Sequence, residues 1–277
     1  MTAQEQLDRL MMKLAQDYQR LNAKQQSFAI KEIGRVRLEI GDMLADYAGD
    51  DGMIKKQRLN RLLRDLESIE KSVRKTGEIA FTKVAEESSS FAIAGASSAL
   101  VEAVGAATIS GIAFDRINRH VLEYVTRRFA DDGLVLSDRV WNLAGEQRDQ
   151  LSKVLRSGII RGESVSKMIA GVRQVYDNET WKIRRLVVTE GNTAMRTAVA
   201  FNGRESNIVQ GIRIHRGKAN RPDHKCTVLE LADSYGLGTG VYPTSASEVY
   251  NPHVNCTSTL TYELVEREAL FRNANER

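Results

Sequence analysis

The spacing of apolar residues constrains the fold of this chain more than any other feature. Apolar side chains recur every three or four residues over 7–21, 33–47 and 59–73, which is typical of amphipathic helices that pack along one seam. The turn residues Gly49-Asp50-Asp51-Gly52 separate the second run from the third. Only three prolines interrupt 277 residues. We therefore expect residues 1–90 to form a long, coiled-coil-like helical hairpin.

Residues 91–114 are rich in Ala, Gly and Ser and contain one charge, Glu102. The segment is long enough to cross a bilayer, for which about 20 apolar residues suffice. Its small side chains and the central Glu102 work against insertion, and small residues also allow helices to approach closely. We expect a buried or oligomer-packing helix and a connector over 91–130. A transient membrane contact and a flexible hinge are the alternatives.

Further helices are expected over residues 131–205. Ser137, Ser164 and Thr180 each precede an apolar stripe and are good N-cap residues, so three helices are predicted, with short separators such as 177–178. Thr189 and Glu190 fall on the last of these helices. We expect the Glu190 carboxylate to pair structurally with an arginine about one turn away, at position 184, 185 or 196.

One face of the hairpin's second arm is strongly basic, although the whole chain has a net charge of only +4. Such a face is either simply solvated or a surface for DNA or an acidic partner, whose binding would weaken as salt rises. The basic residues of this face are Lys55, Lys56, Arg58, Arg61, Arg64, Lys71, Arg74 and Lys75.

Beyond residue 205 the helical periodicity stops, and the region 206–264 contains both cysteines and three of the four histidines. Short β-like runs occur at 208–215 and 257–262. Two close pairs stand about thirty residues apart, His224 with Cys226 and His253 with Cys256. Zn²⁺ prefers four tetrahedral N and S ligands, and two short ligand pairs joined by a loop supply them in small modules. The pattern predicts a possible structural zinc site.

Other interpretations of these residues stay open. Cys226 and Cys256 could be ordinary buried thiols, or could form a disulfide, which is uncommon in a cytoplasmic protein. The dipeptide Asp223-His224, with Asn251 and His253 downstream, has some similarity to ββα-metal nucleases, in which a histidine activates water and a divalent ion polarises the phosphate. We find neither a phosphate-binding glycine loop before a helix nor a serine in a nucleophile elbow. The first twenty residues are amphipathic and charged, so we expect cytoplasmic synthesis without a secretory leader.

The order of motifs from 136 to 262 resembles the head-morphogenesis domain of tailed bacteriophages, the Mu F-like minor head proteins. The resemblance covers a little under half of the chain and rests on five pieces in order. They are 137–141 (SDRVW), 158–164 (GIIRGES), 188–190 (VTE) with Ala194 and Ala198, 223–226 (DHKC) with 229–232 (LELA), and 252–256 (PHVNC). In this chain His224 stands where the family typically has a cysteine, Val254 replaces a proline, Thr257 an arginine and Ser258 the last cysteine.

The resemblance implies a structural minor capsid protein rather than an enzyme. Such proteins are made during head assembly in the host cytoplasm, associate with the portal vertex, are packaged inside the head of the virion, and some influence DNA ejection. The implied partners are the portal protein, the major capsid or scaffolding protein, and packaged double-stranded DNA. A metal-dependent nuclease built on Asp223, His224 and His253, and a membrane-active ejection protein using 91–114, are the alternatives.

The expected fold is therefore mainly α, with a long N-terminal hairpin and a helical bundle followed by a small C-terminal α+β, zinc-knuckle-like module. A charged tail over 265–277 completes the chain and would order only on a partner.

Overall fold

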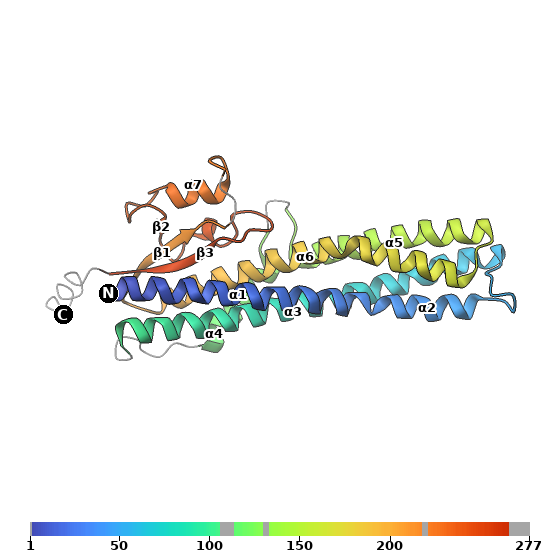
Figure 1. The fold of residues 1–277 in the computed structure, drawn as a ribbon, viewed down its shortest axis with the longest axis horizontal. Coiled ribbons are helices and arrows are strands. Elements are labelled where there is room, and N and C mark those ends of the chain that lie inside the picture. Colours follow the sequence, from blue (N-terminus) through green and yellow to red (C-terminus); the bar gives the residue numbers. More distant parts are fainter. Residues whose placement is uncertain (1, 106–113, 130–132, 218–220, 266–277) are drawn as a thin grey trace. The chain divides into compact units, whose positions relative to one another are not determined.

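The fold is mainly helical with a small α+β module at its C-terminal end, as the sequence predicts (Figure 1). A computed structural model describes residues 2–105, 114–129, 133–217 and 221–265. Six long helices come first: α1 (Ala3–Gly34), α2 (Val36–Tyr47), α3 (Leu59–Val104), α4 (Phe114–Arg127), α5 (Leu136–Arg161) and α6 (Val165–Arg204). The module then contributes β1 (Val209–His215), α7 (Lys225–Leu231), β2 (Val241–Tyr242) and β3 (Thr259–Leu264).

The chain forms two compact units. Unit 1 consists of residues 1–24, 83–127 and 188–277, and unit 2 consists of residues 25–82 and 128–187. Both units therefore combine segments that are far apart in the sequence.

Unit 2 is an all-helical body in which the apolar stripes of the sequence form the core. Ile40, Leu62 and Leu66 are each fully buried. The antiparallel neighbours α5 and α6 approach closely because two glycines face bulkier side chains. A Cβ added at Gly158 would lie 2.8 Å from Met168 Cγ, and one at Gly171 would lie 2.8 Å from Val154 Cγ1.

The region 131–205 contains two long helices where three were predicted. Ser164 starts α6 as expected, and its Oγ accepts a bond from the Lys167 amide at 3.4 Å. The predicted separator at 177–178 and the predicted start after Thr180 are wrong, because α6 continues unbroken to Arg204. Asp and Asn cost a helix interior only about 0.7 kcal/mol each or less, and the burial of Tyr176 and Ile183 on either side outweighs that cost.

Unit 1 has a core that joins the ends of three long helices to the sheet. Leu7, Ile93 and Val199 are buried there together with β-strand residues such as Ile212. A small polar contact lies within this core, where the hydroxyl groups of Tyr18 and Ser88 are 3.0 Å apart. Burial raises the pKa of Tyr18 to about 12, so the phenol stays protonated.

Helix α3 continues without a break through residue 90, where we expected the hairpin to end and a small-residue helix and connector to begin. Its small residues 92, 96 and 99 are buried, and a Cβ at Gly95 would meet Leu14 Cδ1 at 2.2 Å. Glu102 is exposed. Residues 106–113 of the small-residue segment lie outside the described residues. Among the described residues, no helix combines the length and the apolarity needed to cross a membrane.

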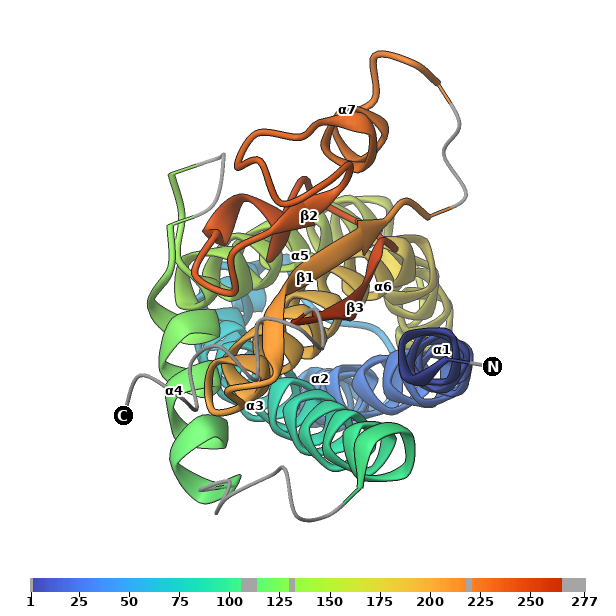
Figure 2. The ribbon, with the colours of Figure 1, turned by 90° about the vertical axis from the view of Figure 1, so that its left-hand side faces the viewer.

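The sheet of the C-terminal module is antiparallel and ordered β2-β1-β3. Ile212 of β1 pairs with Tyr242 and with Tyr262, and β1 has a bulge between Val209 and Gly211. One face of the sheet, with Ile212 and Ile214, belongs to the core of unit 1, and α7 lies over the other side (Figure 2).

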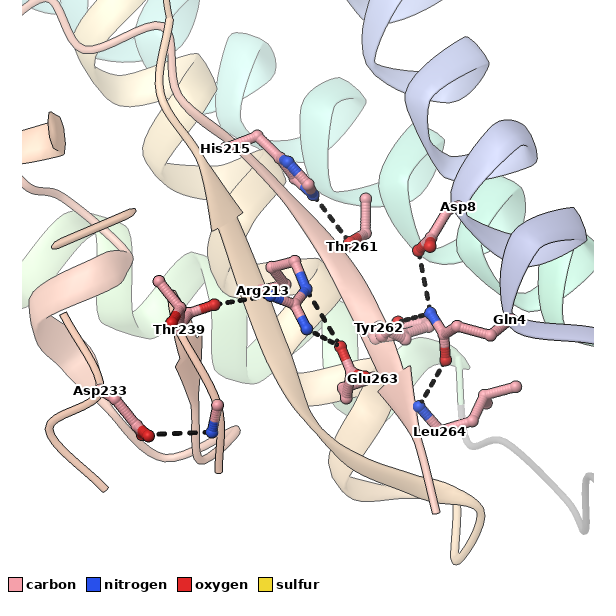
Figure 3. A network of polar contacts seen from close by, with 11 residues as sticks. Gln4, Asp8, Arg213, His215, Asp233, Thr239, Thr261, Tyr262, Glu263 and Leu264 are labelled. Carbon is pink, nitrogen blue, oxygen red and sulfur yellow. Dashed lines mark hydrogen bonds and ion pairs between the residues drawn. The ribbon is translucent and has the colours of Figure 1, made fainter. Parts of the chain in front are cut away.

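Polar side chains fix the register of this sheet and attach it to α1 (Figure 3). Arg213 of β1 makes two bonds to the Glu263 carboxylate of β3, at 2.7 and 3.1 Å. At the outer edge of β3, Gln4 donates to the Tyr262 carbonyl at 2.8 Å and accepts from the Leu264 amide at 2.9 Å. The Gln4 side chain thus bonds to the backbone at the edge of β3 in the way that the backbone of a neighbouring strand would.

Candidate metal centre

The two predicted ligand pairs are positioned by local backbone structure. The His224 carbonyl accepts the first amide bonds of α7, from Thr227 at 2.8 Å and Val228 at 3.0 Å, so Cys226 lies in the first turn of that helix. His253 and Cys256 lie on the loop that precedes β3. Between them Asn255 adopts a left-handed conformation with φ of 60°, which asparagine tolerates better than most residues.

The structure gathers three of the four predicted ligands into one group, and Cys256 lies against Cys226 without belonging to that group. The ligand atoms of His224, Cys226 and His253 all lie within 4.8 Å of one another, so this group could hold a metal ion. Cys226 Sγ lies 3.1 Å from His253 Nε2 and 3.3 Å from Cys256 Sγ. Adjacent ligands of a tetrahedral zinc ion are separated by about 3.4–3.8 Å, given bond lengths of about 2.0–2.3 Å. The observed spacing is close to that value.

The two imidazoles are suited to metal binding. His253 donates Nδ1–H to the Val254 carbonyl at 2.8 Å, which leaves Nε2, the atom facing Cys226, free of a proton. The His224 ring packs edge to face against His253, with 4.5 Å between ring centroids. Its Nδ1 is buried and has no hydrogen-bond partner. A buried nitrogen without a partner is costly, and a metal ion would satisfy it.

Cys226 and Cys256 are free thiols in the structure, and both are buried. The bond donated by the Cys226 thiol lowers the pKa of Cys256 to about 4 against the opposing effect of burial. The Arg196 charge and the Ser258 hydroxyl and amide lower the pKa of Cys256 further. The same shared proton raises the pKa of Cys226. A lowered pKa favours the thiolate form of Cys256, which is the form that binds metals.

Arg196 of α6 holds the loop that carries His253 and Cys256. Its side chain is only 1% exposed. Nε donates to the Tyr250 carbonyl at 2.7 Å, and Nη1 donates to the carbonyls of Ser258 at 2.9 Å and Cys256 at 3.3 Å. One guanidinium thus fixes three points of the loop and brings a positive charge close to the Cys256 sulfur.

Two threonines of α6 provide further anchors that the sequence did not reveal. The Thr189 hydroxyl accepts a bond from the Asn255 amide at 2.9 Å, and the Thr193 hydroxyl lies 3.3 Å from Asn251 Oδ1. The sequence did contain a sign of these anchors, a run of polar residues on an otherwise apolar helix. We interpreted that run only as evidence that Glu190 forms an ion pair. Glu190 itself is completely buried in unit 1.

The remaining predicted residues lie elsewhere. Asp223 is exposed and does not belong to the metal-competent group, so the three proposed nuclease residues are not gathered into one group. On the predicted basic face, Arg58, which precedes α3, donates to the Tyr47 carbonyl. Arg61 lies over the Tyr47 ring, and Arg74 pairs with Glu70 and stacks on Trp141. The other five side chains of that face are exposed: Lys55, Lys56, Arg64, Lys71 and Lys75. Residues 266–277 of the predicted tail lie outside the described residues.

Comparisons of the chain with protein-family models, with curated proteins and with solved structures find no match.

Proposed function

We propose that the C-terminal module binds one structural Zn²⁺ through His224, Cys226, His253 and Cys256. The observation that carries this proposal is the convergence of His224, Cys226 and His253, with Cys256 Sγ 3.3 Å from Cys226 Sγ and a buried His224 nitrogen that has no hydrogen-bond partner. The donor set, two nitrogens and two sulfurs, is one that zinc favours over Mg²⁺ or Ca²⁺.

A structural role fits this set better than a catalytic one. Three ligands are already gathered, and Cys256, which contacts Cys226, would complete a tetrahedral shell, whereas a catalytic zinc keeps one position open for water or substrate. Both thiols are buried, and Arg196 occupies the space behind the loop. The metal would hold α7 against the loop before β3, and no step of chemistry is required of it.

For the whole chain we propose the role of a minor head protein of a tailed phage that associates with the portal vertex inside the head. The order of motifs in residues 136–262 supports this proposal, together with a fold in which long helices carry a small metal-stabilised module. In this proposal the protein acts by docking on the portal and on the capsid or scaffolding protein, near packed DNA, and influences packaging or ejection.

Metal analysis tests the zinc site. Protein purified from zinc-supplemented cells should contain about one equivalent of zinc, and Co²⁺ replacement should give the absorption bands of a cobalt ion with two thiolate ligands. The substitutions Cys256→Ser and His253→Gln should each remove most of the metal. His120→Gln, which changes an exposed histidine of α4, should leave it in place. A wild-type protein that takes up no zinc would refute the site.

Co-expression tests the role in the head. The chain should co-purify with the portal protein encoded beside it, and the zinc content should be unchanged in the complex. If the protein instead ignores the portal and nicks supercoiled DNA with Mg²⁺ in a His224-dependent manner, the nuclease interpretation replaces this one.

A further inference from the structure

Unit 2 has an open groove of about 740 Å³ between α2 and α3 that is separate from the metal centre. Its floor includes the apolar side chains of Met43 and Ile69, and Tyr47 closes one end, where its hydroxyl donates to Asp65 at 2.5 Å. A groove with an apolar floor and a charged rim is typical of a surface that contacts another macromolecule.

The α2 side of the groove is acidic, whereas the opposite side is lined by Arg58, Arg61 and Asp65 and has further exposed cations beyond its lining. On α2, Glu39, Asp42 and Asp46 line it at three- and four-residue intervals, and we call them the acidic row. On α3, three exposed cations stand next to the groove, beyond its lining residue Ser68. At 100° per residue, these cations fall within about 40° of one another around the helix axis. They are Arg64, Lys71 and Lys75, which we call the basic row.

These charges are available to a partner. Among the residues that the structure describes, Asp42, Asp46 and the whole basic row have no ion-pair or hydrogen-bond partner, while Glu39 accepts one bond from the Ser72 hydroxyl at 3.2 Å. By contrast, the Arg74 side chain on the same helix is occupied by Glu70 and Trp141. A partner can therefore pair with the acidic row and the basic row without breaking an existing ion pair.

Two hydrogen bonds across the groove show which charges lie at the same level along the helices. The Glu39–Ser72 bond places Glu39 beside the level of Lys71, and the Tyr47–Asp65 bond places Asp46 beside the level of Arg64. A two-fold rotation about an axis parallel to the helices keeps these heights and exchanges the two sides. The acidic row of one copy then faces the basic row of the other.

We propose that the chain forms a two-fold homodimer in which the α2–α3 grooves of two copies face each other. Asp46 pairs with Arg64 of the second copy, Glu39 and Asp42 pair with Lys71, and each pair occurs twice, because an isologous interface is self-complementary. Charge pairs alone contribute little apolar contact area. The apolar floor of the groove and Leu38, which lies next to the acidic row and is 65% exposed, supply that area.

The charge pattern favours this occupant over two others. A two-fold axis perpendicular to the helices would set acidic row against acidic row, so that arrangement is repelled. A nucleic acid would be attracted by the basic row but repelled by the three carboxylates across the groove. A second copy of this chain pairs the whole acidic row with Arg64 and Lys71 of the basic row.

Charge reversal in the full-length chain tests the dimer by analytical ultracentrifugation. The acid-reversed variant is E39K/D42K/D46K, and the base-reversed variant is R64E/K71E/K75E. Each should weaken dimerisation about ten-fold or more, because every pair turns into a repulsion. Mixing the two variants should restore association as a heterodimer, which also shows that both are folded. Wild-type association should weaken as salt rises from about 0.05 M to about 0.5 M.

A matched control changes the same amount of charge elsewhere in unit 2. R156E/R173E/R184E reverses three exposed arginines of α5 and α6 and should leave the dimer unchanged. A wild-type chain that is monomeric at low salt would overturn the proposal, as would a control variant that weakens association equally. A monomer that binds duplex DNA through the basic row would also overturn it, and would assign the surface to nucleic acid.

Discussion

Unit 2 and the C-terminal module of unit 1 are stabilised in different ways. In unit 2, long helices bury regular apolar stripes, and residues such as Leu62 and Leu66 are completely inaccessible. In the module, the strands are short, and the loop before β3 is held by a buried arginine from α6. Helical packing of this kind distributes stability over many equivalent contacts, whereas the module concentrates it in a few polar groups. Single substitutions should therefore have different consequences in the two regions.

The largest effect is expected from Arg196→Met. The substitution leaves the carbonyls of Tyr250, Cys256 and Ser258 buried without donors, and we expect unit 1 to lose about 3–5 kcal/mol of stability. Hydrogen exchange of the β1 and β3 amides, followed by mass spectrometry, measures the loss. Arg184→Met removes an exposed arginine from the same helix and should change stability by less than about 0.5 kcal/mol. Equal protection of the sheet in both variants would show that Arg196 is dispensable.

Leu66→Ala should have a somewhat smaller effect and should act on the other region. Leu66 is 0% exposed, so the cavity left behind should cost about 3 kcal/mol. Exchange should accelerate in α2 and in the neighbouring part of α3, and the strands of the module should change less. Ile79→Ala on the same helix is the control, since Ile79 is 60% exposed. If strands and helices lose protection equally, the contrast between the two regions does not hold.

The same difference explains what could be predicted from the sequence. The long helices follow from a pattern that repeats every few residues, so the hairpin and the start of α6 at Ser164 were predictable. Helix α5 instead begins at Leu136, one residue before the predicted cap Ser137. The pairs His224 with Cys226 and His253 with Cys256 were also visible, because each pair is close in sequence. The role of Arg196 was not predictable, since it bonds to carbonyls 54 to 62 positions away and nothing in its neighbours indicates that loop. The break expected at 177–178 failed because tertiary burial outweighed a weak local preference.

The Gln4 contacts predict a moderate effect at the boundary of the sheet. Gln4→Ala removes the bonds to the Tyr262 carbonyl and the Leu264 amide, which should cost about 1–2 kcal/mol. Gln4→Glu keeps an acceptor for the Leu264 amide but sets a carboxylate oxygen against the Tyr262 carbonyl and the Asp8 carboxylate, so it should cost at least as much stability. The exchange rate of the Leu264 amide distinguishes the two variants. Equal rates in both would contradict the assigned bonds.

The smallest effect is a pH dependence from His215. Burial lowers the pKa of His215, while Glu230 and Asp8 oppose the shift and Arg213 reinforces it. The unfolded chain therefore binds more protons than the folded chain between the lowered pKa and 6.5. Stability should fall as pH falls through that window and should be unaffected by His215 above it. NMR titration of the His215 ring should give a midpoint below 6.5, and His215→Asn should remove its share of the pH dependence.

The Gln4 contact also bears on how the protein behaves at high concentration. An uncovered strand edge is a template on which other chains can add strands and aggregate. Here β3 is an edge strand whose outward-facing groups at Tyr262 and Leu264 are already bonded by the first turn of α1, and the opposite edge, β2, is only two residues long. Truncations or fusion tags that disturb the first turn of α1 should therefore reduce solubility even though they lie far from the strands in sequence.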